Sequence, residues 1–205
     1  MPAAEELDLI ALICSRLCHD LAGSIGAVNN GVELLAEESD AAMREEAFGL
    51  IAQSAQDAAR RLAFFRLALG ASGDIGEPMA FTELSRVAQN YFAGGKIALA
   101  MPAADATLPK PLAKAVLLGL LLAAQALPRG GNLQLAPAGR NWRIAARGPM
   151  LRWPDTLSTA LAETADWPRE PLPALARYAQ RLSRSAGCRF STEIDETEIR
   201  LEFLS

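Results

Sequence analysis

The chain has 205 residues, of which 51% are hydrophobic and 21% are charged, and this balance excludes an intrinsically disordered protein. The length suffices for one large or two small globular domains. A net charge of −4 and an isoelectric point of about 5.2 argue against nucleic acid as the main partner.

The lack of a recognisable targeting signal and the pattern of cysteines suggest a soluble cytoplasmic protein that does not associate with a membrane. No basic region with a following apolar stretch and cleavage site opens the sequence, so we expect no signal peptide. The longest apolar run, 115–124, is shorter than the roughly 20 residues that span a bilayer, and it predicts a buried helix. Cys14, Cys18 and Cys188 are odd in number and scattered, so we expect small core-facing thiols and no disulfide framework.

Residues 1–76 predict a first domain, for dimerisation and histidine phosphotransfer, that consists of two long helices. Residues 5–37 contain no proline and repeat apolar residues at helical spacing. Ser39 or Asp40 is the expected N-cap of a second helix, 41–69, which ends at the glycine-rich loop 70–76. The short connection predicts an antiparallel hairpin.

Such a hairpin buries only one side of a two-helix layer, so we expect a homodimer in which two hairpins form a four-helix bundle. The predicted dimer seam consists of apolar residues from both helices: Leu21, Ile25, Val28, Phe48, Ile51, Leu62 and Phe65.

Residues 77–205 predict a second, α/β domain, and the fold class is therefore α+β. Its expected elements are a helix at 82–91 capped by Thr82, a strand at 96–100, a helix at 109–127, a strand hairpin at 132–136 and 142–146, a helix at 173–186 capped by Gly187, and a terminal hairpin at 188–194 and 198–203.

His19 is the only histidine of the chain, and Asp20 follows it on the first predicted helix. A His-Asp pair on a helix of a hairpin is a usual way to present a phosphoryl-accepting histidine. A lone histidine can equally be an ordinary surface or core residue. We expect no metal site, because His19 points about 100° away from Cys18 on a helix and a fourth ligand is missing.

The segment 117–131, followed by a strand hairpin, resembles the ATP-binding domain of bacterial sensor histidine kinases. In that resemblance Gly119 and Ala123 occupy the positions of two asparagines that hold Mg²⁺ and phosphates. The segment 145–150 lacks the adenine-binding aspartate, and 151–155 lacks the glycines of the ATP lid. The resemblance implies that the fold of the kinase ATP-binding domain is retained while the residues that bind nucleotide are missing.

The combination of a histidine hairpin and a degenerate kinase domain resembles the ChpT-like histidine phosphotransferases, most sharply over 17–35, and the likeness covers nearly the whole chain. It implies that His19 takes a phosphoryl group from a receiver-domain aspartate and passes it to another receiver, without ATP-dependent autophosphorylation. The implied partners are receiver domains of a hybrid histidine kinase and of response regulators. No cofactor is expected, because the receiver supplies Mg²⁺.

Two sets of residues are candidates for this chemistry. Asp20 could orient the imidazole, although an ordinary solvated carboxylate is the alternative. The expected receiver-binding residues share the helix face of His19: Ser15, Arg16, Ala22, Gly23, Gly26 and Asn30. For Arg16 a surface salt bridge, and for Asn30 simple exposure, remain open.

Two other functions compete with phosphotransfer. The chain could be an atypical sensor kinase with an unusual ATP site, or a non-catalytic dimeric adaptor that docks receivers. We also expect the second domain to offer a docking surface beside His19, with Arg147, Arg152 and Trp153 as candidates.

Overall fold

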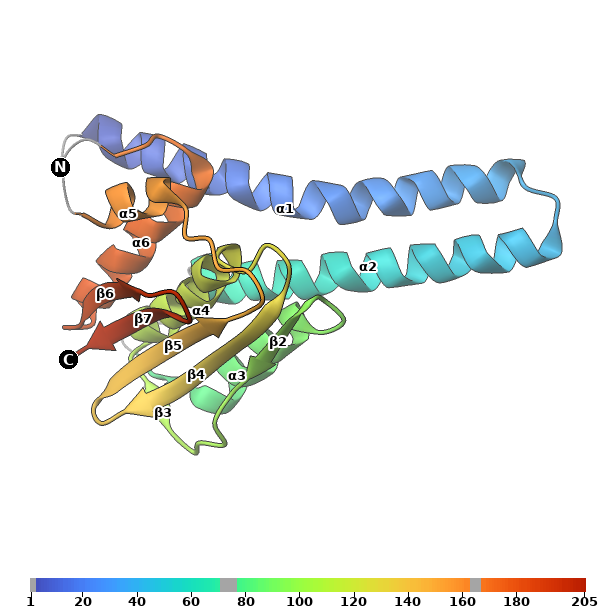
Figure 1. The fold of residues 1–205 in the computed structure, drawn as a ribbon. Helices are drawn as coiled ribbons and strands as arrows, with labels where there is room; N and C mark the ends of the chain where they lie inside the picture. Colours follow the sequence, from blue (N-terminus) through green and yellow to red (C-terminus); the bar gives the residue numbers. More distant parts are fainter. Residues whose placement is uncertain (1–2, 71–76, 163–166) are drawn as a thin grey trace.

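The computed structural model describes residues 3–70, 77–162 and 167–205. Helix α1 (Ala3–Glu37) and helix α2 (Ala41–Leu69) run antiparallel and form a long hairpin that extends beyond the rest of the molecule (Figure 1). The expected hairpin is therefore present, while most of the glycine-rich loop predicted at 70–76 lies outside the described residues.

The turn between the two helices is fixed by side chains. Asp40 is the N-cap of α2, and its carboxylate accepts hydrogen bonds from two backbone N–H groups of the first turn at 2.9 and 3.0 Å. Arg44 donates to the carbonyl groups of Leu35 and Glu38 at 2.8 and 2.9 Å, which satisfies the free carbonyl end of α1. Asp40, and not Ser39, is thus the cap.

The remaining elements build an α/β part, defined here as residues 77–205. They are β1 (Met79–Ala80), α3 (Phe81–Phe92), β2 (Ile97–Ala100), β3 (Thr107–Leu108), α4 (Lys110–Gln125), β4 (Gly131–Ala138), β5 (Asn141–Arg147), α5 (Asp155–Leu161), α6 (Pro171–Ser185), β6 (Arg189–Ile194) and β7 (Ile199–Leu204). Five strands form one sheet in the order β2-β4-β5-β7-β6, and only the β2–β4 pair is parallel. Strands β1 and β3 form a separate antiparallel pair.

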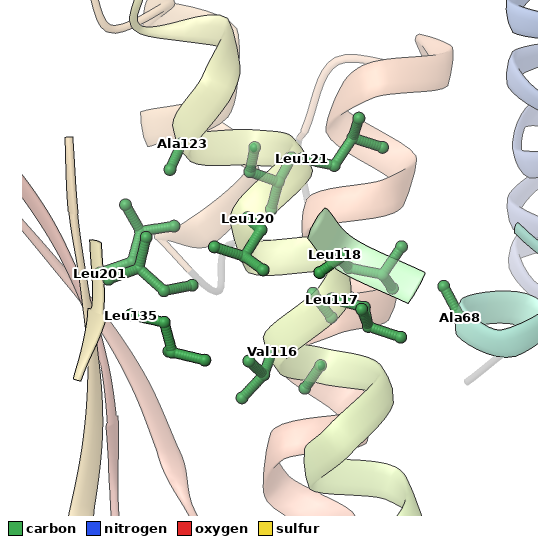
Figure 2. Packing of buried hydrophobic residues seen from close by; sticks show 14 of the residues in the cluster. Ala68, Val116, Leu117, Leu118, Leu120, Leu121, Ala123, Leu135 and Leu201 are labelled. Carbon is green, nitrogen blue, oxygen red and sulfur yellow. The ribbon is translucent and has the colours of Figure 1, made fainter. Parts of the chain in front are cut away.

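One face of the sheet carries the core. Apolar side chains alternate with exposed ones along the strands, so that the same face buries Leu133 and Leu135 of β4 and Ile199 and Leu201 of β7. Helix α4 packs on this face. Figure 2 shows α4 between Leu135 and Leu201 of the sheet on one side and Ala68 of α2 on the other. The predicted α+β class with a C-terminal α/β sandwich is confirmed.

The hairpin and the α/β part share one hydrophobic core. Phe64, Phe65 and Ala68 at the end of α2 are buried in the same cluster as the residues of α4 and the sheet. The buried ammonium group of Lys114 on α4 donates to the carbonyl oxygen of Gly70, which ties the end of α2 to α4. The last turns of α2 therefore fold as part of the α/β core and not as part of an independent hairpin.

Two expectations about the hairpin surface are wrong. Phe65, placed in the dimer seam, is 2% exposed because the last turns of α2 lie against α3, where its ring meets Tyr91 at 6.3 Å between centres. Cys14 and Cys18, expected in the core, are exposed because α1 packs mainly against α2 and α6. Cys188 is buried as expected.

Helix α1 is also more apolar than its lack of a long uninterrupted apolar run suggests. Residues 5–37 have the length and the mean hydropathy, 1.3, of a helix able to cross a membrane, and only 6% of the most apolar window is buried in the protomer. Length and composition are weak evidence for a membrane-spanning helix, because a helix whose apolar face is buried only in an assembled bundle has the same properties.

Two local features of the α/β part differ from expectation. Helix α3 begins at Phe81, and Thr82 does not cap it; the Phe81 N–H instead donates to the carbonyl of Ala106 at 2.8 Å, beside the β1–β3 pair. Helix α5 was not expected, because its seven residues are too few to show helical periodicity.

Candidate functional site

His19 lies near the middle of α1, with 80% of its side chain exposed. At about 100° per residue, the six expected receiver-binding positions all fall within about 60° of His19 around the helix. Ser15, Ala22, Gly23 and Asn30 are exposed, while Arg16 and Gly26 are half-buried. The structure thus places these residues on one accessible face, whose small side chains leave the histidine open to approach.

Asp20 connects the histidine to an arginine. Its carboxylate is only 7% exposed, with Oδ2 accepting from Nε of Arg16 at 2.9 Å and Oδ1 lying 3.1 Å from Nδ1 of His19. When Nδ1 carries the ring proton it donates to this carboxylate, and the lone pair of Nε2 is left free. Asp20 is therefore held from both sides and is not an ordinary solvated carboxylate.

A groove of about 340 Å³ lies beside His19, between α1 and α2. Besides His19 and Asp20, its α1 wall consists of Gly23, Ser24 and Ala27. The α2 wall consists of Ser54, Asp57 and Arg61, which were not singled out from the sequence. These three share one helix face at spacings of three and four, but that pattern becomes informative only once the register of the hairpin is known.

Tyr91 of α3, in the α/β part, contacts the groove residue Arg61. The guanidinium of Arg61 lies over the Tyr91 ring, 5.8 Å from its centre. Burial raises the pKa of the Tyr91 hydroxyl, the charges of Arg61 and Arg16 oppose this rise, and that of Asp20 adds to it. The tyrosine is thus within electrostatic reach of the groups around His19.

The two positions that the resemblance to sensor kinases assigns to nucleotide-binding asparagines lie in the packed interior of the α/β part. Gly119 and Ala123 lie on the buried length of α4. A Cβ on Gly119 would come within 2.9 Å of both Ile144 Cδ1 and Phe203 Cζ. This position therefore faces packed hydrocarbon, and it offers no oxygen or nitrogen to a phosphate or a metal ion.

The candidate docking residues of the α/β part differ in availability. Arg152 is exposed, and Arg147 is exposed but forms an ion pair with Glu198. Trp153 packs against the core with its indole N–H buried and without an acceptor. Among the residues that the structure describes, no three His, Cys, Asp or Glu side chains gather closely enough to hold a metal ion.

Comparisons with known proteins identify the family of this chain. The family model described as histidine phosphotransferase C-terminal domain matches residues 81–198. Protein phosphotransferase ChpT of Brucella abortus (strain 2308) is 38% identical over 200 residues, which cover 94% of this chain and 93% of the relative.

Two solved structures with similar folds cover nearly the whole chain. A bacterial phosphotransferase superposes with a TM-score of 0.83 at 34% identity, covering 96% of each chain. A histidine kinase domain from Erythrobacter litoralis EL346 gives a TM-score of 0.46 at 15% identity, covering 92% of this chain and 94% of that one. With the family model matching more than half of its length and a relative matching nearly all of it, this chain belongs to the ChpT-like histidine phosphotransferases.

Proposed function

We propose that His19 is the phosphoacceptor through which this histidine phosphotransferase passes phosphoryl groups between the receiver aspartates of a bacterial phosphorelay. The observation that carries the assignment is the exposed His19, hydrogen-bonded through Nδ1 to a fixed carboxylate and placed over a groove. No other histidine exists in the sequence to perform this chemistry.

In this proposal Asp20 is a positioning residue. Because its carboxylate accepts from Nδ1–H, the nucleophilic lone pair stays on Nε2, the exposed ring nitrogen. Positive charge develops on the ring as the phosphorus–nitrogen bond forms, and the nearby carboxylate stabilises it. Arg16 holds Asp20 in this position through its Nε contact.

The receiver-binding surface is the His19 face of α1, consisting of Ser15, Arg16, Ala22, Gly23, Gly26 and Asn30. Small residues here allow the active-site loops of a receiver to come within bonding distance of Nε2. The partners are receiver domains of a hybrid kinase and of response regulators, and the receiver supplies the Mg²⁺ that the transfer requires. The exposed Arg152 is the best available docking contact on the α/β part.

The working unit in this proposal is a cytoplasmic homodimer. Large apolar side chains are exposed on both helices of a single protomer, including Ile25 at 50%, Phe48 at 54% and Leu62 at 54%. Each hairpin buries little of α1 by itself, so a second hairpin that covers this surface gives a four-helix bundle. The apolar composition of α1 is then that of a bundle helix.

Incubation with a phosphorylated receiver domain tests the assignment. Wild-type protein should take up the phosphoryl group, and His19→Gln should take up none while keeping its helicity and mass, because the side chain is exposed. Uptake by His19→Gln would refute the assignment. Receiver binding without transfer by the wild type would favour an adaptor, and labelling by MgATP alone would favour a sensor kinase.

A further inference from the structure

We propose that Arg61 of α2 neutralises the charge of the phosphoryl group on its way to and from His19, and that Tyr91 of α3 holds this arginine in place. The inference rests on the function proposed above. The proposed site then includes, besides the residues of α1, Arg61 from the α2 wall of the groove and Tyr91 from the α/β part.

The position of Arg61 is set from two sides. The side chain lines the same groove as His19, across from α1. Its guanidinium lies over the Tyr91 ring at 5.8 Å, within the range of a cation–π contact. Tyr91 is itself fixed, because its ring packs against Phe64 with 4.2 Å between centres. A long flexible side chain is thereby restricted beside the histidine.

The charges in the groove leave this arginine available. Asp20 is engaged by Arg16 and His19, and Asp57 forms an ion pair with Arg60. Over the stretches of chain that the structure describes, no carboxylate pairs with Arg61. Among the described residues of this groove, Arg61 is therefore a cation with no direct carboxylate partner, and it lines the same groove as the histidine that receives a dianionic group.

The transfer step defines what this cation does. The Nε2 lone pair forms the new bond to phosphorus while the bond from phosphorus to the aspartyl oxygen breaks, and that electron pair leaves with the carboxylate of the receiver. The proton on Nδ1 stays in place against Asp20. Negative charge is spread over the three transferred oxygens in the transition state, and a guanidinium at their side lowers its energy.

A small phosphodonor tests Arg61 without a receiver. Phosphoramidate donates its phosphoryl group to Nε2 and releases ammonia, and phosphorus NMR follows phosphohistidine on the single histidine of the chain. Arg61→Met should slow labelling by about tenfold or more, since loss of one preorganised charge-stabilising group typically has a large effect on rate. Arg61→Lys should recover part of the rate. Arg66→Met, a matched change of an exposed arginine on the same helix, should label as wild type.

Tyr91 is tested by a double-mutant cycle, which separates positioning from folding. Tyr91→Leu should slow labelling when Arg61 is present and change it little in the Arg61→Met background, whereas Tyr91→Phe keeps the ring and the rate. An equal slowing by Tyr91→Leu in both backgrounds overturns its positioning role. Wild-type labelling by Arg61→Met overturns the role of the arginine but leaves His19 as acceptor. Labelling of His19→Gln, in contrast, contradicts the proposed function itself.

Discussion

Gly119 provides a quantitative test of how tightly the core is packed around the middle of α4. Replacing it with asparagine introduces the residue type that the resemblance to sensor kinases implies at this position. In this structure the new Cβ would lie 2.9 Å from Ile144 Cδ1 and 2.9 Å from Phe203 Cζ. Both side chains are fully buried, so neither can turn into solvent to make room.

Three contributions determine how Gly119→Asn changes the free energy of unfolding. Overpacking a filled core typically costs about 1–3 kcal/mol. A buried carboxamide without partners adds about 1–3 kcal/mol. The better helix propensity of asparagine returns a few tenths of a kcal/mol. We therefore expect Gly119→Asn to lower the free energy of unfolding by about 2–5.5 kcal/mol and the melting temperature by roughly 5–20 °C.

Urea and thermal unfolding followed by circular dichroism, at one fixed protein concentration, measure this change. Gly49→Asn is the matched control, because a Cβ there meets nothing within 4 Å and the same exchange should shift stability by less than about 0.5 kcal/mol. Unchanged stability of Gly119→Asn would show that the core has room there. Binding of MgATP by the Gly119→Asn/Ala123→Asn double variant, measured by calorimetry, would show that the α/β part can accommodate a nucleotide beside α4.

Three further predictions concern other parts of the molecule. Asp20→Asn should slow phosphotransfer about 100-fold while phosphohistidine still forms on His19, and a wild-type rate in a rapid-quench assay would rule out the orienting role. Phe48→Glu should give a monomeric mass by light scattering with unchanged helicity, since it charges an exposed apolar side chain of the proposed seam; a dimer of undiminished affinity contradicts that seam. Hydrogen bonds from the Thr197 backbone and hydroxyl, then from the Glu198 backbone, lower the pKa of Asp195 to about 2. Because the pKa of this carboxyl is lower in the folded state, the carboxylate stabilises the fold above pH 3.8 and loses that effect as the pH falls toward 2. Asp195→Asn should therefore weaken the dependence of the urea midpoint on pH between these values. Parallel curves of urea midpoint against pH for the variant and the wild type would refute this prediction.

The sequence predicted the long elements well because their periodicity is long enough to be unambiguous. Both helices of the hairpin, the buried α4 and the paired strands lie within a few residues of their predicted limits. The Asp40 cap follows from local chemistry alone, since a short acceptor side chain precedes a helical stretch. His19 stands out from composition, being the only histidine of the chain.

What could not be predicted depends on contacts between distant segments. Phe65 has the spacing of a seam residue, and only the packing of α2 on α3 shows that it is buried within one protomer. Arg61 and Tyr91 are separated by thirty positions, and nothing in either local pattern indicates that a guanidinium rests on that ring. Cys14 and Cys18 were misplaced for the same reason, because helical spacing does not say which faces of α1 are covered.

The core shared by α2 and the α/β part has a thermodynamic consequence for partner binding. Because Phe64 and Ala68 are embedded in that core and α1 packs on α2, the hairpin that carries His19 and the sheet form one folded unit. A receiver that contacts both therefore does not have to restrict the motion of one against the other, and the entropy of that ordering is already spent in folding. The heat-capacity change on binding should accordingly match the apolar surface buried at the interface alone, with no added contribution from coupled ordering.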